Sequence, residues 1–175
     1  MKIYTKRLLL VPLGLQFLRS THKYAGDLEN TKYMVHLPNM NIDETKSFLD
    51  SVEAEWQKQR PQFYEYAILF DNEHIGAISL YMNEDYTEGE LGWIISKEYW
   101  GNGYASEAAQ AMIDFGIQEL NIRRFIAHCD SENNNSYKVM EKLGMSLEYK
   151  TQGRKNKLSD EDREELMYSL VVSQN

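Results

Sequence analysis

The sequence predicts an α/β (α+β) fold: a mixed, mostly antiparallel central sheet of about seven strands flanked by about four helices. The first observation is a run of three strand-like segments, residues 63–70, 74–82 and 89–96, separated only by short polar turns. Connections this short favour antiparallel neighbours. The second is a strong helical pattern at 104–120 followed at once by a strand-like segment at 122–130. A strand, a helix and a strand in succession predict one right-handed parallel crossover within the sheet.

The N-terminal quarter of the chain supplies one strand and two helices. Residues 3–13 are rich in branched and aromatic side chains and predict a strand that ends near Pro12. A short amphipathic helix is expected over 15–24. A longer helix begins at a cap formed by Asn41 or Asp43, repeats apolar residues every four positions, and ends before residue 61.

The C-terminal half completes the sheet. The helix at 104–120 has a narrow stripe of small residues that allows close packing on a sheet. The stripe consists of Ala105, Ala108, Ala109, Met112, Gly116 and Leu120. A helix is expected from Asn133 to Leu143, where Gly144 favours a left-handed end. Residues 145–151 and 165–172 supply two late strands.

Composition restricts the classes of function. The 175 residues predict one domain, 1–175, and carry a net charge of -8, which argues against nucleic-acid binding and favours a cationic partner. No apolar run is long enough to span a membrane, and the N-terminus lacks the features of a secretory signal. Cys129, the single cysteine, is interpreted as a small buried apolar residue rather than a reactive thiol. We therefore expect a cytoplasmic protein without a membrane partner.

The turn that opens the helix at residue 104 is the most informative local feature. Gly101 and Gly103 leave backbone N–H groups bare at the positive end of the helix dipole, which makes an anion site, although glycines also serve any tight turn. A P-loop needs Lys-Ser or Lys-Thr after its last glycine, whereas Tyr104-Ala105 follows here. A dinucleotide fingerprint fails as well, because the later βαβ units are missing.

Three motifs together resemble the GCN5-related N-acetyltransferases (GNAT), in the branch of the ribosomal-protein alanine acetyltransferases. They are TKRLLL at 5–10, WGNGYASEA at 100–108 and NNNSYKVMEKLGM at 133–145. The resemblance spans nearly the whole chain. One departure is Trp100, which stands where the family usually has Gln or Arg.

The resemblance implies that acetyl-CoA is the cosubstrate and that an amine is the acceptor. The splayed strand at 93–95 would pair its main chain with pantetheine, the loop at 101–106 would bind the diphosphate, and Asn133 would contact the cofactor or cap its helix. A homodimer is also common among such proteins. The cofactor-binding candidates are Trp93, Ile94, Ile95, Gly101, Asn102, Gly103, Tyr104, Ala105, Ser106 and Asn133.

Acyl transfer to nitrogen needs a proton acceptor, an oxyanion donor and a source of a proton for the thiolate. Glu90 is our candidate base, with Glu88 as the alternative, and the N–H of Ile95 is the candidate oxyanion donor. Many family members place a Tyr acid where this chain has Met140, which cannot donate a proton. Ser136 is therefore the candidate acid, with neighbouring Tyr137 or water as alternatives.

The four histidines lack metal-ligand spacing. We interpret His74 as a solvated turn residue and His128 as a core residue, with a position in the cleft as the alternative for His128. Together these observations predict an N-acetyltransferase that moves acetyl to a protein N-terminal α-amine or a small-molecule amine by direct attack in a ternary complex. A non-catalytic acyl-CoA-binding module is one rival. A transferase of a longer acyl group, with Lys97 or Arg123 at the acyl end, is another.

Overall fold

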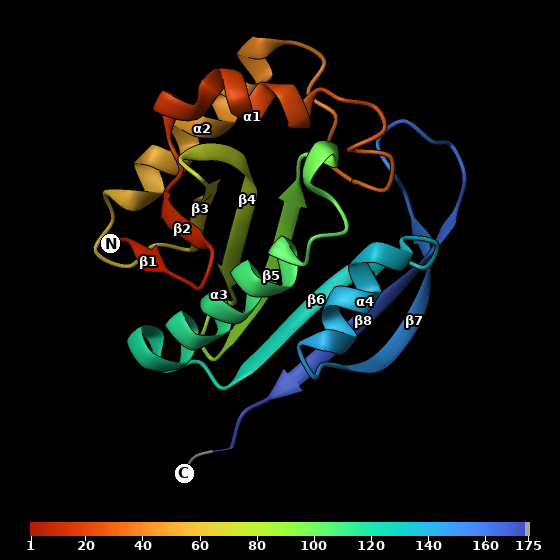
Figure 1. Ribbon diagram of the computed structural model, residues 1–175. Helices are drawn as coiled ribbons and strands as arrows, with labels where there is room; N and C mark the ends of the chain where they lie inside the picture. Colours follow the sequence, from red (N-terminus) through yellow and green to blue (C-terminus); the bar gives the residue numbers. More distant parts are fainter. Residues whose placement is uncertain (174–175) are drawn as a thin grey trace.

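A computed structural model describes residues 1–173 and contains a single eight-stranded sheet (Figure 1). In space the strands run β1-β2-β3-β4-β5-β6-β8-β7, and only β5 and β6 are parallel neighbours. The strands are β1 (Ile3–Tyr4), β2 (Leu8–Pro12), β3 (Phe63–Phe70), β4 (Glu73–Met82), β5 (Glu88–Ile95), β6 (Arg124–Asp130), β7 (Ser146–Arg154) and β8 (Arg163–Val171). The predicted fold class and parallel crossover are confirmed.

Four α-helices cover the sheet: α1 (Leu18–Ala25), α2 (Ile42–Trp56), α3 (Tyr104–Leu120) and α4 (Asn134–Lys142). Short 3-10 turns occupy Leu15–Phe17, directly before α1, and Lys97–Tyr99. Within residues 1–173, no helix is both long enough and apolar enough to cross a bilayer.

The expected single strand at 3–13 is wrong, because the chain folds there into the hairpin β1–β2. The Thr5 backbone N–H donates to the Leu8 carbonyl at 3.0 Å, and the Leu8 N–H donates to the Thr5 hydroxyl at 2.9 Å. The threonine side chain thus closes the turn that separates β1 from β2. Arg7 in this turn also donates to the Asn102 carbonyl, in the loop before α3.

The helices lie in two layers on opposite faces of the sheet (Figure 1). Alternation along β3 shows the division, since Tyr64 and Tyr66 belong to the core beneath α3, whereas Ala67 belongs to the core beneath α1 and α2. The small-residue stripe of α3 faces the sheet as expected. A Cβ on Gly116 would lie 2.7 Å from Phe125 of β6, so only glycine permits this close approach.

Strands β5 and β6 separate shortly after they begin. Their register joins Glu88 to Arg124, Gly89 to Phe125 and Glu90 to Ile126, and then ends. Beyond this point β5 pairs only with β4, and β6 only with β8. The resulting V between the two strands is visible in Figure 1. It leaves one edge of β5 open in the middle of the sheet, where a ligand can lie.

Candidate active site

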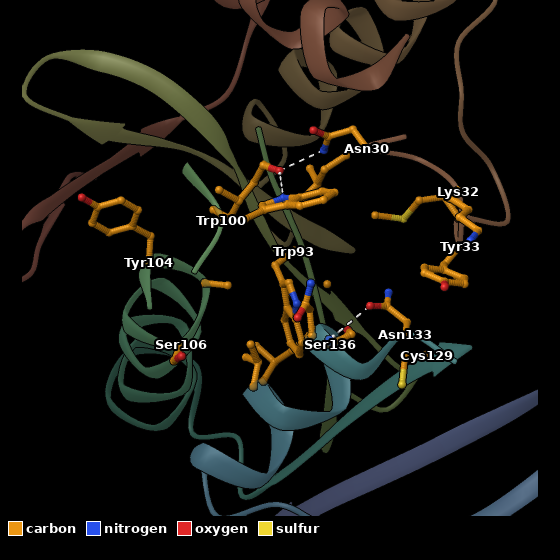
Figure 2. Close-up of a pocket in the computed structure, with 18 of the residues that line it drawn as sticks. Asn30, Lys32, Tyr33, Trp93, Trp100, Tyr104, Ser106, Cys129, Asn133 and Ser136 are labelled. Atoms are coloured by element: carbon orange, nitrogen blue, oxygen red, sulfur yellow. Dashed lines mark hydrogen bonds between the residues drawn. The ribbon is translucent and has the colours of Figure 1, made fainter. Parts of the chain in front are cut away.

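A cavity of about 660 Å³ lies in the opening between β5 and β6. This volume falls within the range typical of small-molecule sites. Its walls come from β5, the loop before α3, the start of α4 and the loop after α1 (Figure 2). Its lining includes Trp93, Ile94, Ile95, Gly101, Gly103, Tyr104, Ala105, Ser106, Asn133 and Ser136. The structure therefore brings most of the predicted site residues to one place.

The glycine loop forms one end of the cavity. Gly101 and Gly103 both have φ of +77°, in the left-handed region that favours glycine, and Gly103 caps α3 without any side-chain acceptor. The first helical bond runs from the Glu107 N–H to the Gly103 carbonyl. Among residues 1–173, the backbone N–H groups of 101–106 donate to no carbonyl or side chain. Several backbone donors thus point from one turn at a helix N-terminus, where an anion is favoured.

The turn between β1 and β2 holds this loop in place. Glu107 accepts from the Thr5 hydroxyl at 2.6 Å, from the Arg7 N–H at 2.7 Å and from Arg7 Nε at 2.7 Å. Arg7 also donates to the Asn102 carbonyl at 3.0 Å and stacks over the Tyr104 ring at 4.6 Å. Asn102 does not line the cavity, and its Nδ2 donates to the Tyr99 and Trp100 carbonyls at 3.0 Å. The motif at 5–10 and the motif at 100–108 are therefore two halves of one contact.

Burial of Glu107 opposes its ionisation, but the hydrogen bonds from Thr5 and Arg7 outweigh burial and lower the pKa of Glu107 below its usual value of 4.5. The carboxylate is therefore charged at neutral pH and lies in the first turn of α3, where the helix dipole also stabilises it.

The open edge of β5 forms the floor of the cavity. The Ile95 carbonyl accepts from Asn30 Nδ2 at 2.9 Å and from Trp100 Nε1 at 2.7 Å, so it points away from β4 (Figure 2). Main-chain groups alternate along a strand, so the N–H groups of Trp93 and Ile95 point to the open edge. Ile94 lies opposite Ala77, and its main chain faces β4 instead. Trp100, which stands where the family usually has Gln or Arg, thus anchors the start of the loop through its bond to the Ile95 carbonyl.

Helix α4 forms the opposite wall. Asn133 caps it by accepting from the Ser136 N–H at 3.2 Å, and both side chains lie at the cavity (Figure 2). Met140 is fully buried, and its thioether carries no transferable proton, so it cannot serve as the acid. Tyr137 packs against the core and does not line the cavity, so Ser136 is the better placed hydroxyl.

Lys142, at the end of α4, brings a positive charge to the glycine loop. Its Nζ would lie 3.5 Å from a Cβ built on Gly103, and it lines the cavity. Within residues 1–173 it forms no salt bridge. A cation beside bare backbone donors strengthens an anion site.

Glu90 and His128 meet where β5 and β6 part. Glu90 Oε1 lies 2.7 Å from His128 Nδ1, and His128 lines the cavity. The alternative base, Glu88, instead forms a salt bridge with Arg124 Nε at 2.7 Å. The interpretation of His128 as a core residue is therefore wrong, since it is only partly buried and faces the cleft. The reason is the divergence of the strands, which uncovers this position.

His74 is also placed differently from our expectation of a solvated turn residue. It lies on β4 between the rings of Phe17 and Tyr24, and its two ring nitrogens contact the Ser20 hydroxyl and the Gly76 carbonyl. Burial lowers its pKa to about 4, so it is neutral at physiological pH.

Sequence reasoning missed Asn30, Lys142 and the pairing of Glu90 with His128. Asn30 is buried and bridges the Ile95 carbonyl to the Lys97 N–H, yet it lies in a loop without a recognisable pattern. Lys142 lies within the motif at 133–145, but only the position of α4 beside the glycine loop gives it a role. The pairing across β5 and β6 depends on strand register, which no local signal in the sequence gives.

Comparison with known proteins agrees with this geometry. The model of the family described as "Acetyltransferase (GNAT) domain" matches residues 7–146, which is most of the chain. An uncharacterized N-acetyltransferase, YnaD of Bacillus subtilis (strain 168), is 34% identical over 151 residues, covering 85% of this chain and 84% of that protein. The chain belongs to the GNAT acetyltransferase family. It is therefore an acyltransferase that uses acetyl-CoA as its cosubstrate.

Two further relatives extend the comparison. The spermidine N(1)-acetyltransferase of Escherichia coli (strain K12) is 28% identical over 140 residues, covering 79% of this GNAT chain and 73% of that protein. The solved structure of a ribosomal L7/L12 alpha-N-protein acetyltransferase in complex with coenzyme A superposes with a TM-score of 0.85 at 20% identity, covering 98% of each chain. At this identity the second similarity shows the fold alone.

Proposed function

We propose that this protein transfers acetyl from acetyl-CoA to a primary amine by direct attack in a ternary complex, and that the amine is cationic in solution. The observation that carries the proposal is the cavity in the V between β5 and β6, with bare backbone donors at one end and His128, which is paired with Glu90, at the other. Acetyl-CoA fits this arrangement, because its diphosphate is negatively charged and its reactive thioester lies at the other end of the pantetheine.

In this proposal the N–H groups of 101–106 bind the diphosphate, with Lys142 beside them. The open edge of β5 then guides pantetheine as an added strand would. Trp93 lies closer along β5 to Glu90 than Ile95 does, so we assign the Trp93 N–H to the thioester oxygen and the Ile95 N–H to a pantetheine carbonyl. This assignment revises the sequence-based choice of Ile95 as oxyanion donor.

Ser136 would donate a proton to the leaving thiolate, since it is the hydroxyl of α4 at the cavity. Asn133 would orient the first turn of α4 and contact the cofactor.

A primary amine acceptor is supported by charge. Glu90 is about half exposed at the mouth between the strands, the chain carries a net charge of -8, and the Escherichia coli relative is named for spermidine. A protein N-terminal α-amine is the second candidate, and its lower pKa makes the neutral, reactive form more abundant. A longer acyl group has less support: Lys97 pairs with Asp27 and Glu29, while Arg123 donates to the Ile117 and Ile122 carbonyls.

The test is thiol release from acetyl-CoA with a panel of polyamines, amino sugars and short peptides with free N-termini. We expect release with at least one primary amine and none with its N-acetylated form. Tight binding of acetyl-CoA without release on any amine would favour the non-catalytic module. Faster release from succinyl-CoA than from acetyl-CoA would favour the longer acyl donor. The same proposal includes a cytoplasmic location, which fractionation of cells tests.

A further inference from the structure

The contact between Glu90 and His128 joins the two strands at the point where they separate. Glu90 lies opposite Ile126 in the last paired position of β5 and β6. His128 follows Ile126 by two residues, so the side chains of Glu90 and His128 lie on the same face of the sheet. His128 is therefore the first side chain of β6 on this face beyond the paired region, and it borders the cavity that Glu90 itself does not line.

The hydrogen bond fixes which nitrogen of His128 can accept a proton. An ionised carboxylate only accepts hydrogen bonds, so the 2.7 Å contact requires a proton on Nδ1. In the neutral ring the lone pair then lies on Nε2. A carboxylate that sets the tautomer of a histidine and stabilises its protonated form is a known arrangement for a general base.

The charges around His128 favour its protonation. The hydrogen bond that His128 donates to Glu90 is the largest cause and raises the pKa of His128 above its usual value of 6.5, against the opposing effect of burial. Glu165 on β8 adds to the increase, while Arg154 on β7 opposes it. Arg154 and Glu165 form an ion pair with each other and act on His128 in opposite directions, and the contact with Glu90 is a larger cause than either.

We propose that His128 is the general base of the reaction and that Glu90 is a positioning residue that sets its tautomer and basicity. The inference rests on the proposed acetylation of a primary amine. It transfers the role of base from Glu90, where sequence reasoning placed it, to His128. An imidazole, with an ordinary pKa of about 6.5, is in general a better acceptor for an amine proton at neutral pH than a carboxylic acid, with an ordinary pKa of about 4.3.

The neutral amine nitrogen forms a bond to the thioester carbon, and the carbonyl electrons move to oxygen. Nε2 of His128 takes one N–H proton from the nitrogen, which has become positive. The C–O double bond re-forms as the C–S bond breaks, and its electrons leave on sulfur. The thiolate takes a proton from Ser136, which regains a proton from solvent, while the imidazolium releases its proton to solvent, so one amide and one thiol result.

The test combines kinetics with a titration that needs no acceptor. The rate kcat, measured at saturating acetyl-CoA and an active amine from the panel, reports groups of the ternary complex across pH 5.5–9. For the wild type we expect the rate to fall as His128 becomes protonated at low pH. His128→Asn should lower kcat by about 100-fold and remove this acidic limb. Glu90→Gln should lower kcat less and move the acidic limb to lower pH, since the ring loses its charged partner.

The matched control is Glu88→Gln, on the same strand and the same face, which should leave the pH profile in place because Glu88 pairs with Arg124. NMR titration of the His128 ring in the free protein should show a pKa above 6.5 in the wild type and a lower value in Glu90→Gln. This titration also checks the contact if His128→Asn folds poorly.

Four outcomes separate the ideas. A lost limb in His128→Asn and a shifted limb in Glu90→Gln support the inference. If an amine is acetylated but His128→Asn keeps its rate and its limb, the inference fails while the proposed function stands. A Glu90→Gln enzyme that is inactive at every pH, with an unchanged His128 titration, would return the role of base to Glu90. If no amine is acetylated, both proposals fail.

Discussion

The two ends of the cavity are built in different ways. The end near α3 consists of backbone N–H groups in the short segment 101–106, helped by a nearby clamp. At the end where β5 and β6 part, the side chain of His128 lines the cavity, and Glu90, 38 residues away in the chain, contacts that ring without lining the cavity. A backbone site depends on conformation and tolerates many side chains, whereas a side-chain site depends on strand register. The glycine end should therefore fail through backbone changes, and the other end through changes of single functional groups.

Removal of the clamp at the glycine end should have the largest effect on stability. Glu107→Ala leaves Thr5 and Arg7 without their shared acceptor, and hydrogen bonds to a charged group contribute about 1.5–3 kcal/mol. We expect unfolding in urea to show a loss of about 2–3 kcal/mol at pH 7. The exposed Glu119→Ala, at the far end of the same helix, should change stability by less than about 0.5 kcal/mol.

The same variant has a predictable pH dependence. The folded protein lowers the pKa of Glu107, so its contribution is fully present above the usual value of 4.5 and is lost as pH falls through the folded pKa. The difference in stability between wild type and Glu107→Ala should thus shrink below about pH 4.5. A difference that stays constant down to pH 3 would mean that the charge of Glu107 contributes nothing.

A change of backbone preference at the glycine loop should mainly affect the cosubstrate. Gly103→Ala forces a side chain into the left-handed region, which costs about 1–2 kcal/mol, and brings a Cβ near Lys142 and Arg7. We expect KM for acetyl-CoA to rise about tenfold. Gly144→Ala is the matched control, since its φ is +78° and no atom lies within 4 Å of the new Cβ. Equal increases in KM for both variants would contradict a role of the 101–106 backbone.

Replacement of Lys142 should raise the KM for acetyl-CoA by a smaller factor than Gly103→Ala does. Lys142→Ala should raise KM for acetyl-CoA about threefold in low salt, and this difference should fade as salt screens the charge. Lys138→Ala, one turn earlier on α4 and away from the cavity, should leave KM unchanged. A salt-independent loss in Lys142→Ala would indicate a packing effect instead.

Cys129 gives the smallest expected effect. Its side chain is buried at the cavity wall, and burial raises the pKa of its thiol to about 11. An alkylating reagent at pH 8 should therefore label the native protein far more slowly than the protein in urea, as mass spectrometry would show. Rapid labelling of the native state, accompanied by loss of activity, would identify an exposed thiol in the cavity.

The contrast between the two ends also explains what the sequence could predict. Helix α3 and the glycine turn before it follow from local preferences, because small residues and glycines act within a few positions. The split of the first strand was missed because the turn at Thr5, Lys6 and Arg7 contains no glycine or proline to mark it. Asn30 and His128 were missed for a different reason: their roles depend on contacts 65 and 38 residues away in the chain.

The central claim is that one ligand spans both ends of the cavity, and a structure of the complex with acetyl-CoA tests it most directly. We expect the diphosphate oxygens to accept hydrogen bonds from the N–H groups of 101–106 and the thioester to lie between the Trp93 N–H and the His128 ring. Diphosphate bound elsewhere, or a thioester directed away from His128, would contradict the account.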